Sequence, residues 1–328
     1  MMKAAWYERN GAAAEVLQFG DRPTPEPGPG EVRIRLAYSG VNPSDVKSRA
    51  GSRPVSDLYI IPHSDGAGVI DQVGAGVDPA RVGQRVWTWN AQYGRPLGTC
   101  AQYVALPENQ AVFLPTRASM QEGACLGIPA LTAYQAVELA EIEAGHVVLV
   151  IGGASAVNFY AAQMARERGA RVICTVGSQA KADLLREAGF DELILYKEQD
   201  VAREVLKLTG SKGVNAIIDM DFSTSAALIE QGVLASHGQF VCFGSNDRGW
   251  IPVSFGALLP RSISLKFFLV YELTEKQRKV CVEGVNRLLE QGVLQHLSGP
   301  CFALEEIVAA HEAVESGKEV GKVLVHCE

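Results

Sequence analysis

The stretch from Val147 to Ser178 constrains the fold more than any other part of the chain. The apolar run Val147–Ile151 is typical of a buried strand, and Gly152 and Gly153 follow it at once. A helical pattern then extends to Gly169, after which a second apolar strand begins. This order of strand, glycine turn, helix and strand places a helix N-terminus where it can bind the pyrophosphate of a dinucleotide.

The turn after the first strand departs from the usual glycine pattern. A strict dinucleotide fingerprint has further glycines where this chain has Ser155, Ala156 and Asn158. The first two are small enough for close backbone approach, whereas Asn158 must find room between helix and strand or turn toward the phosphates. A turn that binds no ligand can have a similar sequence. The predicted phosphate-binding loop consists of Gly152, Gly153, Ala154, Ser155, Ala156, Val157 and Asn158.

The end of the second strand bears on the choice between NAD and NADP. An NAD site usually has an acidic residue here, which binds the ribose 2′-hydroxyl. No acid occurs between Thr175 and Ser178, and Lys181 follows shortly. Tyr196 ends the next predicted strand at a comparable level. A small polar loop with a nearby cation favours a 2′-phosphate, and so NADPH, although a lysine on a helix is more often simply solvated.

Composition excludes several classes of protein. The 328 residues carry 30 Lys and Arg against 37 Asp and Glu, a net charge of −7, which argues against nucleic acid or an anionic membrane as the main partner. The seven cysteines are scattered and never form a CxxC motif, as expected of reduced thiols in a cytoplasmic protein. We find no signal-peptide pattern and no apolar run of membrane-spanning length.

Two kinds of pattern divide the chain. The first 120 residues contain short alternating strands such as Glu31–Tyr38 and Gly66–Val73, which predict an antiparallel barrel or sandwich. Apolar strands then alternate with helical patterns, which predicts a parallel, doubly wound sheet and an α/β fold. We expect a β-rich domain at residues 1–121, a dinucleotide-binding domain at 122–262, and a last part at 263–328 that adds an edge strand and returns to the first domain.

Several helices are predicted from their periodicity and end signals. One covers Gln121–Glu141 and is interrupted at Pro129, and another covers Thr224–Ala235. Near the C-terminus we predict helices at Glu275–Gln291 and at Leu304–Ser316.

Several motifs follow one another along the chain: SGVNPSDVKSRAG (39–51), IPHSDGAGVIDQVGAGV (61–77), VGQRVW (82–87), LGIPALTAYQAV (126–137), the dinucleotide loop and the terminal GKVLV. In this order they resemble the medium-chain dehydrogenase/reductase superfamily, and within it the zinc-independent quinone oxidoreductases of the zeta-crystallin type. The resemblance covers nearly the whole chain. It implies a GroES-like β-barrel domain, a Rossmann domain, an active-site cleft between them, and hydride transfer from NADPH.

The same resemblance bears on zinc. Zinc-dependent relatives have a Cys at the position of Asn42, a His at that of Ser64 and a third ligand near Ile128, and none of these three is a metal ligand here. The four-Cys structural lobe is also absent. His63 and Asp65 lie close in sequence, but zinc needs three or four convergent ligands. We therefore expect no metal site.

The resemblance also assigns site residues. It places Asn42 facing the nicotinamide, Asp45 and Tyr59 around the substrate pocket, and Thr132 near the nicotinamide. Tyr59 could donate a hydrogen bond to a quinone oxygen, although a packed loop aromatic is at least as common. Asp221 adds negative charge where the cofactor could lie. The remaining cofactor residues implied are Phe243, Gly244, Ser245, Asn246, Phe267, Phe268, Leu269 and, near the adenine-side phosphate, Lys322.

The function expected on these grounds is NADPH-dependent, zinc-independent reduction of quinones or related conjugated carbonyls. An enoyl or alkenal reductase shares the same scaffold and is not separated from it by the sequence. A weakly catalytic or non-catalytic NADPH-binding protein is the alternative from another class, suggested by the altered loop. Relatives commonly form homodimers through the edge strand of the Rossmann domain, and the apolar stretch LKFFLVY (265–271) is consistent with such an edge.

Overall fold

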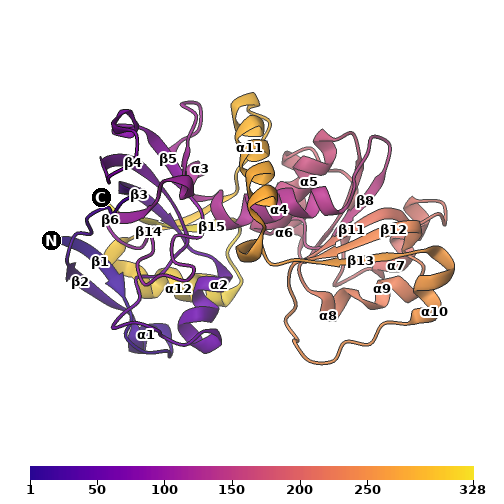
Figure 1. Cartoon of the computed structure of the whole chain (residues 1–328). Coiled ribbons are helices and arrows are strands. Elements are labelled where there is room, and N and C mark those ends of the chain that lie inside the picture. Colours follow the sequence, from indigo (N-terminus) through magenta and orange to yellow (C-terminus); the bar gives the residue numbers. More distant parts are fainter. The chain divides into compact units, whose positions relative to one another are not determined.

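The computed structural model describes residues 1–328 and contains two compact units. Each unit has a large sheet of its own (Figure 1). Unit 2 interrupts unit 1 in the sequence, since unit 1 includes both ends of the chain. The functional domain limits expected at residues 121 and 262 stay a prediction. Unit 1 comprises residues 1–129, 285–292 and 296–328, and unit 2 comprises residues 130–284 and 293–295.

Nine strands belong to unit 1: β1 (Met2–Trp6), β2 (Gln18–Arg22), β3 (Glu31–Gly40), β4 (Asp65–Val73), β5 (Arg85–Thr88), β6 (Tyr103–Pro107), β7 (Ala111–Phe113), β14 (Ser298–Ala303) and β15 (Lys322–His326). Seven of them form a sheet in the order β14-β15-β3-β4-β5-β7, with β6 also paired to β3. Only β14 and β15 pair in parallel. The predicted antiparallel character of this part is therefore confirmed, and the C-terminal strand β15 pairs with β3.

Strand β3 shows why this part of the chain folds as a sheet. Its apolar residues Val32, Ile34 and Leu36 alternate with polar ones, and all three are fully buried. Because successive side chains of a strand point to opposite faces, the alternation places one face of β3 in the core. There it packs with Ile70 of β4 and Val104 of β6.

The helices of unit 1 are short. They are α1 (Ala13–Val16), α2 (Pro43–Lys47), α3 (Met120–Ala124) and α12 (Ile307–Ser316). Helix α12 packs on β14, β15 and α2 and ends at Gly317, whose φ of 62° is the left-handed conformation that favours glycine. Helix α2 begins after Asn42, and the proline at its first position has no N–H to lose.

Unit 2 has a six-stranded sheet in which every pair is parallel. Its order is β10-β9-β8-β11-β12-β13, the 3-2-1-4-5-6 order of doubly wound dinucleotide-binding sheets. The predicted parallel sheet is therefore confirmed. The strands are β8 (Val147–Val150), β9 (Arg171–Val176), β10 (Leu193–Leu195), β11 (Val214–Asp219), β12 (Leu234–Cys242) and β13 (Ser264–Phe267).

Helices cover both faces of this sheet. Figure 1 shows α5 and α6 on one face and α7, α8 and α9 on the other. No helix of the chain is both long enough and apolar enough to cross a membrane. The helices of unit 2 are α5 (Ala156–Glu167), α6 (Gln179–Glu187), α7 (Val201–Leu208), α8 (Phe222–Ser225), α9 (Ala227–Glu230) and α10 (Phe255–Leu258), while α4 (Gly127–Leu139) and α11 (Glu275–Gln291) each contribute residues to both units.

Two predicted helices need correction. Pro129 does not interrupt a helix, because it lies in the first turn of α4, where a missing N–H costs nothing, and the break falls before Gly127. The helix predicted over Thr224–Ala235 is instead the two short helices α8 and α9. It ends at Glu230 because Gly232 has a φ of 78°, and β12 has already begun at Leu234. The strands β1, β2, β7 and β14 were not predicted.

Candidate active site

The predicted dinucleotide-binding residues of the loops lie along one edge of the unit 2 sheet. Parallel strands all end at this edge, and ligands of doubly wound proteins bind outside it. Gly152 follows β8 with a φ of 73°, and its N–H donates to Thr175 Oγ1 at 2.9 Å. A Cβ on Gly153 would lie 2.8 Å from the sulfur of Cys174, so only glycine lets the turn pass this close to β9.

Helix α5 begins at this turn with free backbone donors. Ser155 is the N-cap, and its hydroxyl accepts a hydrogen bond from the Asn158 N–H at 3.3 Å. The N–H groups of Ala156 and Val157 donate to no group of the chain. These donors and the positive end of the helix fit a pyrophosphate.

Asn158 finds room inside the unit. Its side chain is fully buried, and its Nδ2 donates to the carbonyl oxygen of Ile151 at the end of β8. The amide oxygen of Asn158 has no partner in the chain. The amide is therefore engaged with the strand rather than the helix N-terminus, and the altered loop keeps its anion-binding donors.

Around the ends of β9 and β10 lie three of the predicted cofactor residues. Ser178 caps α6 by accepting from the Lys181 N–H at 3.4 Å. A Cβ on Gly177 would lie 2.7 Å from the hydroxyl of Tyr196, so the tyrosine ring lies over this turn. Lys181 forms no ion pair. Its ammonium group is therefore available to an anion bound at the ends of β9 and β10.

The loops after β11 and β12 are tied together by Asp221. Its carboxylate accepts from the Asn246 N–H at 2.8 Å, from Asn246 Nδ2 at 2.7 Å and from the hydroxyl of Ser223 at 2.6 Å. Burial opposes ionisation, but these hydrogen bonds outweigh it and lower the pKa of Asp221. The carboxylate is thus stabilised within the unit by neutral donors, and it keeps its negative charge near the predicted cofactor loops.

The remaining predicted segments close the same edge. A Cβ on Gly244 would lie 2.6 Å from the carbonyl oxygen of Met220, so the turns after β11 and β12 nearly touch. The rings of Phe243 and Phe268 lie 6.0 Å apart, and Phe267 at the end of β13 and Leu269 after it are exposed. These loops therefore lie at the edge where doubly wound sheets bind their ligands.

Unit 1 contains a buried polar cluster of Asn42, Asp65 and Lys322. Asn42 Nδ2 donates to Asp65 Oδ2 at 2.8 Å, and Lys322 Nζ lies 2.7 Å from the same oxygen while also donating to Asn42 Oδ1. The other carboxylate oxygen, Oδ1, accepts from the Ile128 N–H at 2.8 Å. All three side chains are at most 3% exposed. A buried ion pair needs such additional hydrogen bonds to offset the loss of hydration.

Asp45 is part of the same cluster. Its Oδ2 accepts from the Asn42 N–H at 2.8 Å. Burial and the nearby charge of Asp65 raise the pKa of Asp45 to about 7, against the opposing effect of Lys322. The carboxyl can therefore hold a proton at neutral pH.

A second buried network connects to this cluster and was not predicted. Thr99 Oγ1 donates to the Asp65 carbonyl oxygen at 2.6 Å and lies 2.7 Å from Ser39 Oγ, which is 2.8 Å from His63 Nδ1. His63 Nε2 in turn lies 2.9 Å from His311 Nε2. Burial lowers the pKa of both imidazoles, that of His311 to about 3, so both are neutral. The only sequence signal was His63 and Asp65, close together in HSDGAG.

The remaining predicted residues belong to different units. Lys322 contacts Asn42 within unit 1, and Thr132 is buried in the part of α4 that belongs to unit 2, so their predicted roles toward the cofactor stay predictions. The ring of Tyr59 packs under the guanidinium of Arg22, whose carbon is 4.5 Å from the ring centre. Tyr7 was not predicted as a site residue. Burial, and to a smaller extent the charge of Asp45, raise the pKa of Tyr7 to about 12.

No group of three or more His, Cys, Asp or Glu side chains is arranged to hold a metal ion. Of the positions that carry ligands in zinc-dependent relatives, Asn42 is engaged with Asp65 and Lys322, and Ser64 is buried.

Comparison with known proteins gives consistent results for both units. Residues 28–116 match the family model of the alcohol dehydrogenase GroES-like domain, and residues 156–285 match that of the zinc-binding dehydrogenases. A quinone oxidoreductase of Pseudomonas aeruginosa is 30% identical over 319 residues, which cover 95% of each chain. The chain belongs to the quinone oxidoreductase family.

This family lies within the medium-chain dehydrogenase/reductase superfamily, and solved structures agree. The crystal structure of an NAD-dependent alcohol dehydrogenase is 31% identical and aligns over 100% of both chains with a TM-score of 0.90. A mycobacterial structure complexed with NADPH is 28% identical and aligns over 99% of this chain and 100% of that one, with a TM-score of 0.86.

These comparisons confirm the predicted family, and with it the GroES-like and Rossmann fold. As a quinone oxidoreductase family member, the chain is an oxidoreductase that uses a nicotinamide cofactor and a small-molecule substrate.

Proposed function

We propose that this chain is an NADPH-dependent, zinc-independent reductase of quinones or related conjugated carbonyls. The observation that carries the proposal is the buried cluster of Asn42, Asp65 and Lys322. The Lys322 ammonium is already paired with Asp65, where a metal cation would have to compete with it. Prolonged treatment with a chelator should leave the reductase activity unchanged, and loss of activity that zinc restores would refute this part of the proposal.

The choice of NADPH rests on the ends of β9 and β10. No acidic side chain follows β9 before α6, and Lys181 has no ion-pair partner there. A carboxylate would repel a 2′-phosphate, whereas a lysine attracts one. The names of the structural relatives include both an NAD-dependent enzyme and an NADPH complex, so the choice of NADPH is supported by these residues and not by the relatives.

Lys181→Ala tests this choice, with the exposed Lys276→Ala as the matched control. We expect the control to keep the wild-type ratio of kcat/KM for NADPH over NADH. Lys181→Ala should lower that ratio about tenfold, since a charge-assisted hydrogen bond contributes about 1.5–3 kcal/mol. An unchanged ratio would remove Lys181 from the cofactor site.

The chemistry divides between cofactor and protein. When bound, the nicotinamide supplies a hydride, and reduction of a conjugated carbonyl also consumes one proton. Ser155, Ala156 and Val157 begin the helix that holds the pyrophosphate in this proposal. Asn42 and Lys322 hold the Asp65 carboxylate within the buried cluster, and Asp45 can hold a proton at neutral pH.

The proposal is tested first by fluorescence titration with NADPH and then by steady-state assays. We expect saturable NADPH binding and oxidation of NADPH by a small quinone such as 1,4-benzoquinone. Faster turnover of a 2-alkenal than of any quinone would instead identify an alkenal reductase. Binding of NADPH without turnover of either would indicate a sensor, and absence of binding would contradict every model with hydride transfer.

We also propose that the chain acts in the cytoplasm as a homodimer. All seven cysteines are free thiols, six of them buried, as in proteins of reducing compartments. Strand β13 is an edge of the unit 2 sheet, and large apolar side chains are exposed at its last residue, Phe267, and just after it at Leu269. Sedimentation at micromolar concentration should give a dimer, which Phe267→Lys should weaken; a monomer would contradict the proposal.

A further inference from the structure

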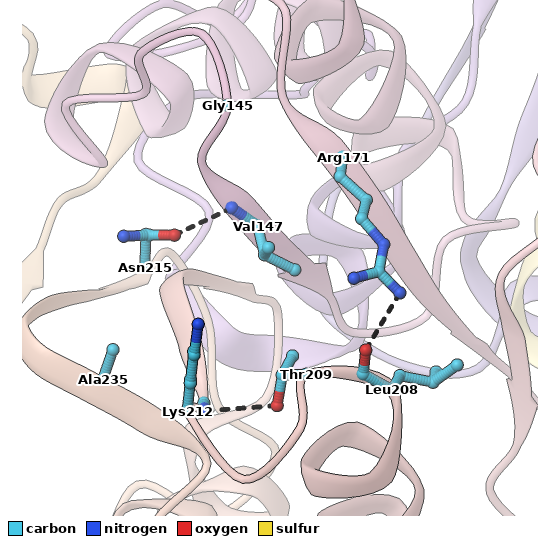
Figure 2. Close-up of a pocket in the computed structure, with 9 residues that line it drawn as sticks. Gly145, Val147, Arg171, Leu208, Thr209, Lys212, Asn215 and Ala235 are labelled. Carbon is cyan, nitrogen blue, oxygen red and sulfur yellow. Dashed lines mark hydrogen bonds between the residues drawn. The ribbon is translucent and has the colours of Figure 1, made fainter.

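The opposite edge of the unit 2 sheet, where the parallel strands begin, has a cavity with a volume of about 480 Å³. Its walls come from the starts of β8, β9, β11 and β12 and from the turn after α7 (Figure 2). The predicted cofactor loops all follow the ends of these strands. The cavity is therefore separate from the dinucleotide edge of the same unit.

Arg171 forms one wall of the cavity. Its Nε and Nη2 donate to the two carboxylate oxygens of Glu192 at 2.7 and 2.5 Å, and Nη2 also donates to the Leu208 carbonyl oxygen at 3.1 Å. These contacts fix the guanidinium plane and leave Nη1 without a hydrogen bond to the chain. Arg171 thus presents a preorganised donor whose charge is shared with Glu192.

Lys212 and Asn215 supply the other donors, and Figure 2 shows Lys212 and Arg171 on different sides of the cavity. Lys212 forms no ion pair. Asn215 Oδ1 accepts from the Val147 N–H at 2.8 Å, so the amide is held in place, and its Nδ2 donates to no group of the chain. Every unsatisfied side-chain polar group around the cavity is therefore a donor.

The charge of the cavity is unlike that of the whole chain. No Asp or Glu lines it, whereas the chain as a whole has a net charge of −7. The turn that carries Lys212 is rigid, since Thr209 Oγ1 accepts from the Gly213 N–H at 3.2 Å and donates to the Val205 carbonyl oxygen at 2.8 Å. Cationic and amide donors fixed around a pocket recognise anions, above all phosphate.

We propose that this cavity binds a phosphate group, most favourably that of a small phosphorylated metabolite. Its volume lies within the range of about 300–1,000 Å³ typical of small-molecule sites and exceeds what one inorganic phosphate fills. Val147 and Leu208 provide apolar wall for the organic part of such a ligand. This site does not depend on the proposed reductase activity.

Calorimetric titration of the whole chain tests the site, with glycerol 3-phosphate and inorganic phosphate as probes at constant ionic strength set with chloride. We expect saturable binding in the millimolar range or tighter. Lys212→Gln should weaken it at least tenfold. Asn215→Asp keeps the acceptor for the Val147 N–H while adding a negative charge, and should weaken it as strongly. The exposed Lys276→Gln makes the same change of charge elsewhere and should leave it unchanged.

The two probes distinguish the sources of the phosphate group. Tighter binding of glycerol 3-phosphate identifies an organic phosphate, and equal binding identifies free phosphate. Absence of saturable binding for both overturns the proposal. So does binding that Lys212→Gln leaves intact, because phosphate would then occupy another place, such as the N-terminus of α5. If Lys276→Gln weakens phosphate binding as much as Lys212→Gln does, the effect comes from net charge alone and the proposal is also overturned.

Discussion

Replacing Asp45 by Asn tests whether the buried cluster of unit 1 is as constrained as its geometry indicates. Asp45 is 4% exposed, and burial with the charge of Asp65 raises its pKa from 3.8 to about 7. Asn has the shape of the protonated carboxyl and can still accept the Asn42 N–H. The substitution therefore removes the ionisation and keeps the contact.

The sign and size of the effect follow from linkage between protonation and folding. Because the pKa of Asp45 is higher in the folded than in the unfolded state, its protonation stabilises the folded state. This stabilisation is complete below about pH 4 and is lost as the pH rises through about 7. At about 1.4 kcal/mol per pKa unit, the loss is about 4 kcal/mol of the free energy of unfolding. The variant should match the wild type near pH 4 and exceed its stability by up to about 4 kcal/mol at pH 8.

Urea denaturation of both proteins between pH 4 and pH 8 measures this difference, with the exposed Asp57→Asn as the control for loss of one carboxylate. We expect the Asp45 variant to lose the fall in stability between pH 4 and pH 7. If the two proteins show parallel pH dependence over the whole range, Asp45 does not titrate near 7 and the reasoning is refuted.

Two further substitutions test packing around the site by urea denaturation. Lys322→Met leaves the Asp65 charge buried without its partner and should lower the free energy of unfolding by about 3–5 kcal/mol. Adding Asp65→Asn to this variant should recover part of the loss. If Lys322→Met alone lowers the free energy of unfolding by no more than the error of measurement, the ion pair is contradicted. Gly153→Ala places a Cβ 2.8 Å from the Cys174 sulfur and should lower the free energy of unfolding by about 1–3 kcal/mol. The control is Gly256→Ala, whose added Cβ would have its nearest neighbour atom at 3.7 Å. Equal urea midpoints for the two variants would argue against the close approach at Gly153.

Much of the fold could be predicted because local patterns and final contacts agree. The alternation in Glu31–Tyr38 became a half-buried strand, and the apolar run at Val147 became the central strand of a parallel sheet. The helix predicted over Thr224–Ala235 failed partly because Gly232 ends it and partly for a non-local reason. Leu234 pairs with Val214 on the neighbouring strand, and no local periodicity shows such a pairing.

The site was predicted less completely, because its polar groups meet through long-range contacts. Lys322 reaches Asn42 only because β15 pairs with β3, with Leu324 opposite Gly40. From sequence, Asp221 looked like a repulsive charge. Its satisfaction depends on Asn246, which belongs to a different loop.

The pairing of β15 with β3 also has a consequence during synthesis on the ribosome. All strands of unit 2 lie within one continuous segment, so its sheet can form while the chain is still growing. Unit 1 cannot complete its sheet until β15, which follows all of unit 2 in the chain, has emerged. Until then β3 lacks one neighbour and Asp65 lacks the lysine that pairs with it. The nascent chain must therefore keep an unfinished sheet edge from aggregating while the whole of unit 2 is made.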